Sequence, residues 1–167
     1  MKLNLGCEDK IIKGFENIDV VKREGVKVLD LNEIPYPYKD NSVDYILIEH
    51  TLMFLDNPLK VMEELYRICR DQTIIKVIVN HHSHFNNFTD LKQKCSFSYF
   101  TFGEDWVNHN INSKVKVLKR KLIFTRCHFK FLNYIFNPII NLFPTLYERF
   151  FSFILPCSSV LFVMERK

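Results

Sequence analysis

KLNLGCEDKIIKGFENIDV, residues 2–20, contains two short apolar segments, at 2–5 and 15–20. The same pattern recurs at 26–31, 43–49 and 73–79. Short segments of this kind, rich in branched apolar residues and bounded by polar residues or glycine, predict β-strands. Because five of them fall within the first 80 residues, with one helix among them, the sequence predicts an α/β sheet.

The helix is predicted to begin at Asn57 and Pro58. The Asn57 side chain can cap the first turn, and Pro58 lacks an amide proton that this turn does not use. Apolar residues then recur on one face: Leu59, Met62, Leu65, Tyr66 and Cys69. Charged residues fall largely on the other face: Lys60, Glu63, Glu64, Arg67 and Arg70. This pattern predicts an amphipathic helix that packs on the sheet.

The connections between the first three strands are unusually short. Residues 6–14 and 21–25 fall below the dozen or so residues that a parallel crossover normally takes. The helices usual at these places are therefore expected to be vestigial or absent. We hypothesise that the Phe-rich C-terminal segment, or a second subunit, covers part of the sheet face that they would leave open.

The C-terminal part predicts two late strands, at 115–124 and 159–165, which we expect to be antiparallel. Between them, residues 131–155 carry apolar segments broken by proline, a pattern typical of short helices. The fold class expected is therefore α/β: a Rossmann-like, mostly parallel sheet with an antiparallel C-terminal strand and a helical insertion before the last strand. Residues 1–167 form one domain in this interpretation, with an apolar helical insertion at 128–157.

Composition narrows the possible partners. The 167 residues carry a formal net charge of +4, and the cations between Lys114 and Lys121 alternate with apolar residues, as on a strand with one solvated face. Nucleic acid is therefore a disfavoured partner. The apolar tail is interrupted too often for a membrane span, so shallow membrane contact stays open without being favoured. A homodimer is also open.

Cysteine usage indicates a reducing compartment. The chain has an odd number of cysteines, at wide and irregular spacing: Cys7, Cys69, Cys95, Cys127 and Cys157. No CxxC pair occurs, and we expect no signal peptide ahead of them. These features predict reduced thiols and a cytoplasmic location.

Several strand ends carry residues suited to ligand binding, and ligands of parallel sheets collect at this edge. Here the chain resembles a family, the small class I methyltransferases that use S-adenosylmethionine, whose first strand ends in Leu-Gly-Cys-Gly and whose second ends in Asn-Ile/Val-Asp. The matching segments are Leu3-Asn-Leu-Gly-Cys7, Gly14-Phe-Glu-Asn-Ile-Asp19, Leu29-Asp-Leu31, residues 35–44 and His50-Thr-Leu52. Weaker matches extend through Ser83-His-Phe85, Thr89-Asp90 and Phe97-Ser98-Tyr99.

The resemblance implies a cofactor, S-adenosylmethionine, and roles for its binding residues. Gly6 lets the backbone approach the cofactor closely, and Asp19 accepts hydrogen bonds from both ribose hydroxyls. Asp30 binds the adenine amino group and Leu31 lies against the ring. Leu5 and Cys7 supply backbone or apolar contacts. A single aspartate at a strand end is more often a turn residue, but three such sites in succession are harder to explain in that way.

Methyl transfer to a hydroxyl or amine needs alignment, exclusion of water and a base, but no metal. His50 is the first candidate for the base by its position, and the other imidazoles are His81, His82 and His84. The HxH spacing of the last group could hold a metal, but no further ligand stands at a familiar spacing, so we expect no metal site. Loop histidines at a substrate mouth are the favoured interpretation. The aromatic regions 85–106 and 131–153 favour a small or medium-sized, hydrophobic acceptor.

Some positions depart from the family pattern. Glu8 replaces the second glycine of the first loop, and its charge would repel the cofactor carboxylate unless it turns away. Met53 and Phe54 replace a polar pair, although core packing explains them equally, and Gln93 replaces a histidine. These departures support an alternative: a catalytically degenerate methyltransferase fold that acts as a binding or scaffold module.

Overall fold

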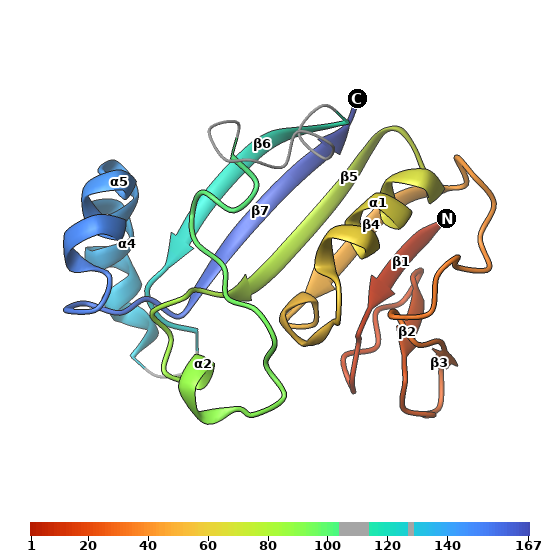
Figure 1. The fold of residues 1–167 in the computed structure, drawn as a ribbon, viewed down its shortest axis with the longest axis horizontal. Helices are drawn as coiled ribbons and strands as arrows, with labels where there is room; N and C mark the ends of the chain where they lie inside the picture. Colours follow the sequence, from red (N-terminus) through yellow and green to blue (C-terminus); the bar gives the residue numbers. More distant parts are fainter. Residues whose placement is uncertain (104–113, 127–128) are drawn as a thin grey trace.

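The computed structural model describes residues 1–103, 114–126 and 129–167, and its centre is a single seven-stranded sheet (Figure 1). The strand order is β3-β2-β1-β4-β5-β7-β6. The strands are β1 Lys2–Leu5, β2 Glu16–Asp19, β3 Val26–Val28, β4 Val43–Glu49, β5 Cys69–Asn80, β6 Val115–Ile123 and β7 Ser159–Arg166. β1 to β5 run parallel, and β7 is antiparallel to both β5 and β6. The predicted fold class is confirmed.

The third strand is shorter than predicted. The sequence predicts a strand at 26–31, but β3 ends at Val28. The Leu29 amide still donates to the Asp19 carbonyl, at 3.1 Å. The Asp30 side chain then accepts from the Asn32 amide at 2.8 Å, which turns the chain away from the sheet. Residues 29–31 therefore lie in a turn at the strand end.

Helix α1, Pro58–Ile68, begins where the sequence predicts, with the Asn57 side chain accepting from the Lys60 amide at 3.0 Å. It crosses one face of the sheet (Figure 1). The buried side chains are Val61, Met62, Glu64, Leu65 and Ile68. Leu59, expected on the buried face, is exposed, and Glu64 is buried because its carboxylate accepts from the Tyr36 amide and from Arg67.

The remaining helical segments are short. They are η1 Leu52–Phe54, α2 Asn86–Thr89, η2 Lys130–Leu132, α4 Asn133–Leu142, α5 Pro144–Leu146 and the π-helix η3 Tyr147–Phe151. The short connections expected between β1, β2 and β3 contain no helix. None of the helices in the described ranges is long and apolar enough for a membrane span. The described cysteines are free thiols, whereas Cys127 and Trp106 lie outside the described residues.

An asparagine ladder joins α4 to the edge strand β6. Asn141 accepts from the Leu122 amide and donates to its carbonyl, both at 2.8 Å. Asn137 accepts from the Phe124 amide at 2.8 Å. Asn133 accepts from the Thr125 amide at 3.0 Å and donates to the Thr125 carbonyl at 2.7 Å. The side chains of one helix therefore occupy the hydrogen-bonding positions that another strand would fill.

This placement corrects one expectation. The Phe-rich segment does not lie over the open sheet face beside β1 to β3; α4 and α5 stand beyond β6, at the opposite end of the sheet (Figure 1). Within this segment α4 contacts the β6 edge, because the three asparagines recur every four residues and so share one side of the helix.

Candidate functional site

A cleft of about 430 Å³ opens where β1, β2 and β4 end. The lining residues include most of those predicted from the sequence: Gly6, Asp19, Asp30, Leu31 and His50. Leu5 and Cys7 are buried and are absent from the lining. The parallel strands of the sheet thus bring Gly6 and Thr51, 45 positions apart in the chain, to one edge, where ligands of this architecture bind.

Gly6 has a left-handed backbone conformation, and the side chain of Thr51 occupies the space where a side chain at position 6 would lie. Its φ is +65°, and a Cβ built on it would lie 2.1 Å from Thr51 Oγ1. Thr51 is itself fixed, because its hydroxyl lies 3.2 Å from the Gly6 carbonyl and 3.1 Å from the Glu49 carbonyl. Gly6 thus leaves space for the backbone to turn into the cleft.

Asp19 is nearly buried and organises the loops on either side of it. Its Oδ2 accepts from the Glu8 amide and its Oδ1 from the Val21 amide, both at 2.9 Å. Arg23 lies 3.6 Å from the same carboxylate. Each carboxylate oxygen has two lone pairs, so both can still accept a hydroxyl from a ligand.

Asp30 and Leu31 form the next wall. One oxygen of Asp30 is used within the turn, where it accepts from the Asn32 amide and side chain at 2.8 and 3.2 Å. Asp30 therefore stabilises a turn. It also lines the cleft, where its carboxylate can bind a ligand. Leu31 is buried and offers an apolar surface beside it.

Glu8 has a left-handed backbone conformation. Its φ is +47°, which favours glycine, and its side chain is exposed and lines the cleft. Of the two altered positions, Met53 is fully buried in the core, while Phe54 is half-buried and also lines the cleft. Core packing therefore explains the apolar residue at position 53. It explains Phe54 only in part, because Phe54 also lines the cleft.

His50 and Glu49 share a cation, Arg126, that the sequence did not indicate. Arg126 contacts His50 Nε2 through Nη1 and Glu49 through Nη2. Burial and the neighbouring Arg126 charge both lower the pKa of His50, so its ring is held neutral. Burial would raise the pKa of Glu49, but hydrogen bonds from Lys10 and Arg126 outweigh it and lower that pKa to about 2.

A second, more apolar pocket of about 500 Å³ adjoins Arg126. Its walls come from the segment after β5, the end of β6 and the C-terminal insertion: Ser83, His84, Phe85, Asn86, Phe124, Thr125, Arg126, Phe129, Leu132, Pro156, Cys157 and Ser158. Because Arg126 also contacts His50, which lines the first cleft, this pair of side chains lies between the two cavities.

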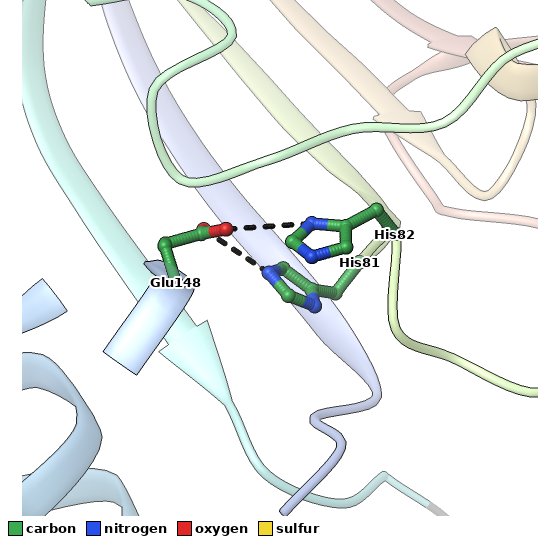
Figure 2. A group of neighbouring side chains, drawn as sticks. All are labelled: His81, His82 and Glu148. Carbon is green, nitrogen blue, oxygen red and sulfur yellow. Dashed lines mark hydrogen bonds and ion pairs between the residues drawn. The ribbon is translucent and has the colours of Figure 1, made fainter. Parts of the chain in front are cut away.

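The structure groups the loop histidines differently from the HxH spacing. His81 and His82, adjacent in the chain, point toward the carboxylate of Glu148 in η3 (Figure 2). His81 Nε2 lies 3.1 Å from Glu148 Oε1, and His82 Nδ1 lies 3.4 Å from Oε2. His84 is outside this group and lines the apolar pocket instead.

The ligand atoms of this group lie within 4.8 Å of one another, close enough for one metal ion. Each is also satisfied within the protein. His81 Nδ1 lies 2.7 Å from Ser83 Oγ and also accepts from the Ser83 amide, which places its proton on Nε2, facing Glu148. The Tyr99 amide donates to the same Glu148 oxygen at 2.6 Å. The group joins η3 to the end of β5, and the absence of a metal stays a prediction.

Comparisons with known proteins agree with the fold. Residues 15–76 match the family model for a methyltransferase domain. An uncharacterized protein of Methanocaldococcus jannaschii, MJ1123, is 32% identical over 84 residues, which cover 49% of this chain. The matched part spans only 41% of that relative's length.

Solved structures resemble nearly the whole chain at low identity. A putative methyltransferase from Bacillus halodurans has a TM-score of 0.64 at 10% identity, covering 99% of this chain and 91% of that one. A SAM-dependent methyltransferase from Archaeoglobus fulgidus has a TM-score of 0.55 at 15% identity, covering 99% and 85%. The complex of Haloferax volcanii Trm112 with a putative methyltransferase gives 0.58 at 15%, covering 99% and 81%. The chain has the fold of class I methyltransferases.

Proposed function

We propose, from the class I methyltransferase fold, that this chain binds S-adenosylmethionine in the cleft lined by Gly6, Asp19 and Asp30 and transfers its methyl group to an acceptor. The observation that carries the proposal is the convergence of these residues, from three successive strand ends, on one cavity. In this assignment Asp19 binds the ribose hydroxyls, Asp30 the adenine amino group, and Leu31 lies against the ring. Leu5 and Cys7 support the loop from beneath.

The acceptor is proposed to bind in the apolar pocket beside Arg126. Phe85, Phe124 and Leu132 line this pocket, which favours a hydrophobic molecule of small or medium size. A neutral His50 between the two cavities can take a proton from the acceptor, since its pKa is lowered. Arg126 would have to release Nε2 first, because it occupies the lone pair that a base uses.

That occupied lone pair, together with Glu8 in the first loop, favours one alternative function. A chain that retained the cleft but did not catalyse methyl transfer would act as a binding or scaffold module. In that case cofactor binding could persist without transfer, whereas a chain that binds no cofactor would also lose the proposed site. Both functions can therefore require Asp19 for cofactor binding, and an assay of methyl transfer separates them.

Cofactor binding is tested by calorimetry and thermal melting with S-adenosylhomocysteine. Ligand at about 100 times its dissociation constant should stabilise the fold by nearly 3 kcal/mol. Asp19→Asn should weaken binding about tenfold or more, because a charge-assisted acceptor is lost. Asp9→Asn is the matched control: it removes the same charge from an exposed residue of the same loop, outside the cleft lining, and should leave binding unchanged. No stabilisation of the wild type at millimolar ligand would contradict the proposal.

A further inference from the structure

The C-terminal insertion exposes an apolar surface of unusual extent. Twelve of its large apolar side chains are between 46% and 87% exposed. They are Phe129, Phe131, Tyr134, Ile135, Ile139, Leu142, Phe143, Leu146, Phe150, Phe151, Phe153 and Ile154. We call this set the insertion surface. Soluble proteins rarely expose so many contiguous large apolar residues unless the surface binds something.

The asparagine ladder explains why this surface faces outward. Asn133, Asn137 and Asn141 turn the polar side of α4 toward β6. Ile135, Ile139 and Leu142 therefore lie on the side that faces away from the sheet. This is the reverse of an ordinary surface helix, whose apolar side packs on the core. The apolar side of α4 is thus available for an external contact.

The charges around the insertion surface are of one sign. Lys130 and Arg149 are exposed within the segment 129–157, and β6 adds Lys119 and Lys121 along a groove shared with Tyr134. The Arg120 guanidinium does not belong to this set, because it packs over the Tyr99 ring. The acid of this segment, Glu148, is turned inward to His81 and His82. The described face therefore combines exposed apolar side chains with flanking cations.

We propose that the insertion surface lies in the interface of a membrane whose lipids are anionic. Aromatic and branched apolar side chains flanked by Lys and Arg are the composition of interfacial segments, in which apolar side chains enter the acyl boundary and cations meet headgroups. A ten-residue helix such as α4 is only about 15 Å long, so it fits along an interface and cannot cross a membrane. The proposal does not depend on methyl transfer.

Charge and composition favour lipid over a second copy of the chain. A protein interface is typically an apolar core with a polar rim in which both partners satisfy hydrogen bonds. Two copies joined through this surface would bring Lys130 and Arg149 toward their own duplicates, with no exposed acid of the segment to pair with them. An anionic lipid surface supplies that missing charge.

The test is flotation of the whole chain with vesicles of phosphatidylcholine alone and of phosphatidylcholine mixed with phosphatidylserine. The wild type should float with the mixed vesicles, and salt should weaken this binding. Ile135→Ser/Ile139→Ser should lower the partition coefficient on the order of tenfold, since two exposed branched side chains no longer enter the lipid. Ile11→Ser/Val28→Ser removes two side chains of similar exposure outside the insertion and should float like the wild type.

Circular dichroism and thermal melting check that both variants fold like the wild type. A wild type that floats with neither vesicle overturns the proposal, and so does an equal loss in the two variants. Equal, salt-independent binding to both vesicles overturns the anionic preference. If sedimentation shows self-association that Ile135→Ser/Ile139→Ser removes, and no vesicle binds, the surface joins two copies and the lipid proposal is wrong.

Discussion

A methyl group on Gly6 would lie 2.1 Å from Oγ1 of Thr51, so the first loop of the cleft and the residue after β4 fit together only when position 6 lacks a side chain. Gly6→Ala should therefore cost several kcal/mol: about 1–2 for the left-handed backbone and a further 1–3 for the forced displacement of Thr51. Urea denaturation measures this loss of stability.

Gly14→Ala is the matched control for that variant. Gly14 has a φ of +82°, but a Cβ built there would meet nothing within 4 Å. It should lose only the backbone part, about 1–2 kcal/mol. Equal losses in the two variants would show that the contact with Thr51 carries no energy.

Replacing Glu8 with glycine should strengthen cofactor binding. The change removes a negative charge from the cleft and suits the φ of +47°. We expect the dissociation constant of S-adenosylhomocysteine to fall about fivefold, as for loss of a like-charge repulsion of about 1 kcal/mol. Gln72→Gly, at an exposed position with a φ of +65° away from the cleft, should leave affinity unchanged. Weaker binding by Glu8→Gly would mean that the glutamate contributes a contact.

Removing the Arg126 charge should raise the pKa of His50. Burial lowers that pKa first and Arg126 lowers it further, so Arg126→Gln should move it up toward the ordinary histidine value of about 6.5. Titration of the His50 ring by nuclear magnetic resonance measures the change. Lys10→Gln removes a cation that contacts Glu49 but not His50, and should have the smaller effect. If Lys10→Gln has the larger effect, Arg126 is not the cation that holds His50 neutral.

The Glu148 group should make stability depend on pH. Burial would raise the pKa of Glu148, but hydrogen bonding to His81 outweighs it and lowers the pKa. A lowered carboxyl pKa stabilises the fold above its unfolded value of about 4.3, and this contribution is lost as pH falls through the folded value. Glu148→Gln should therefore cost about 1–3 kcal/mol near pH 7 and progressively less in acid.

The pH dependence of thermal melting measures that difference. Glu33→Gln removes an exposed carboxylate outside the group and should lie close to the wild type at each pH. The lowered pKa of His82, caused by burial and by His81, lowers the stability of both the wild type and Glu148→Gln in acid, since acid must protonate a ring that the fold keeps neutral. A Glu148→Gln difference that grows in acid would contradict this assignment.

The cleft could be predicted because its residues follow strands that local pattern reveals. Gly6, Asp19 and His50 each come at or just after an apolar segment, and parallel strands place such ends at one edge. The end of β3 was predicted too late, since Leu29 and Leu31 continue the apolar pattern although the Asp30 side chain turns the chain. The hydrogen bond of the Asp30 side chain ends the strand, and a pattern of hydrophobic residues carries no information about such a hydrogen bond.

Arg126 and Glu148 could not be predicted in the same way. Arg126 lies 76 residues from His50, and Glu148 lies 67 residues from His81. Each reaches its partner because β7 pairs antiparallel with both β5 and β6, and the resulting side-chain distances depend on strand register. For the histidines, the adjacent pair proved to matter more than the HxH spacing, because Glu148 faces the pair.

The ladder on β6 also bears on aggregation. An unpaired edge strand is a template on which a strand from another molecule can add, and repeated addition builds fibrils. Asn133, Asn137 and Asn141 occupy the last part of this edge, and Lys116 and Lys119 place exposed charges on the rest. The insertion therefore protects the sheet from growing by self-templating, even though its own outer side is apolar.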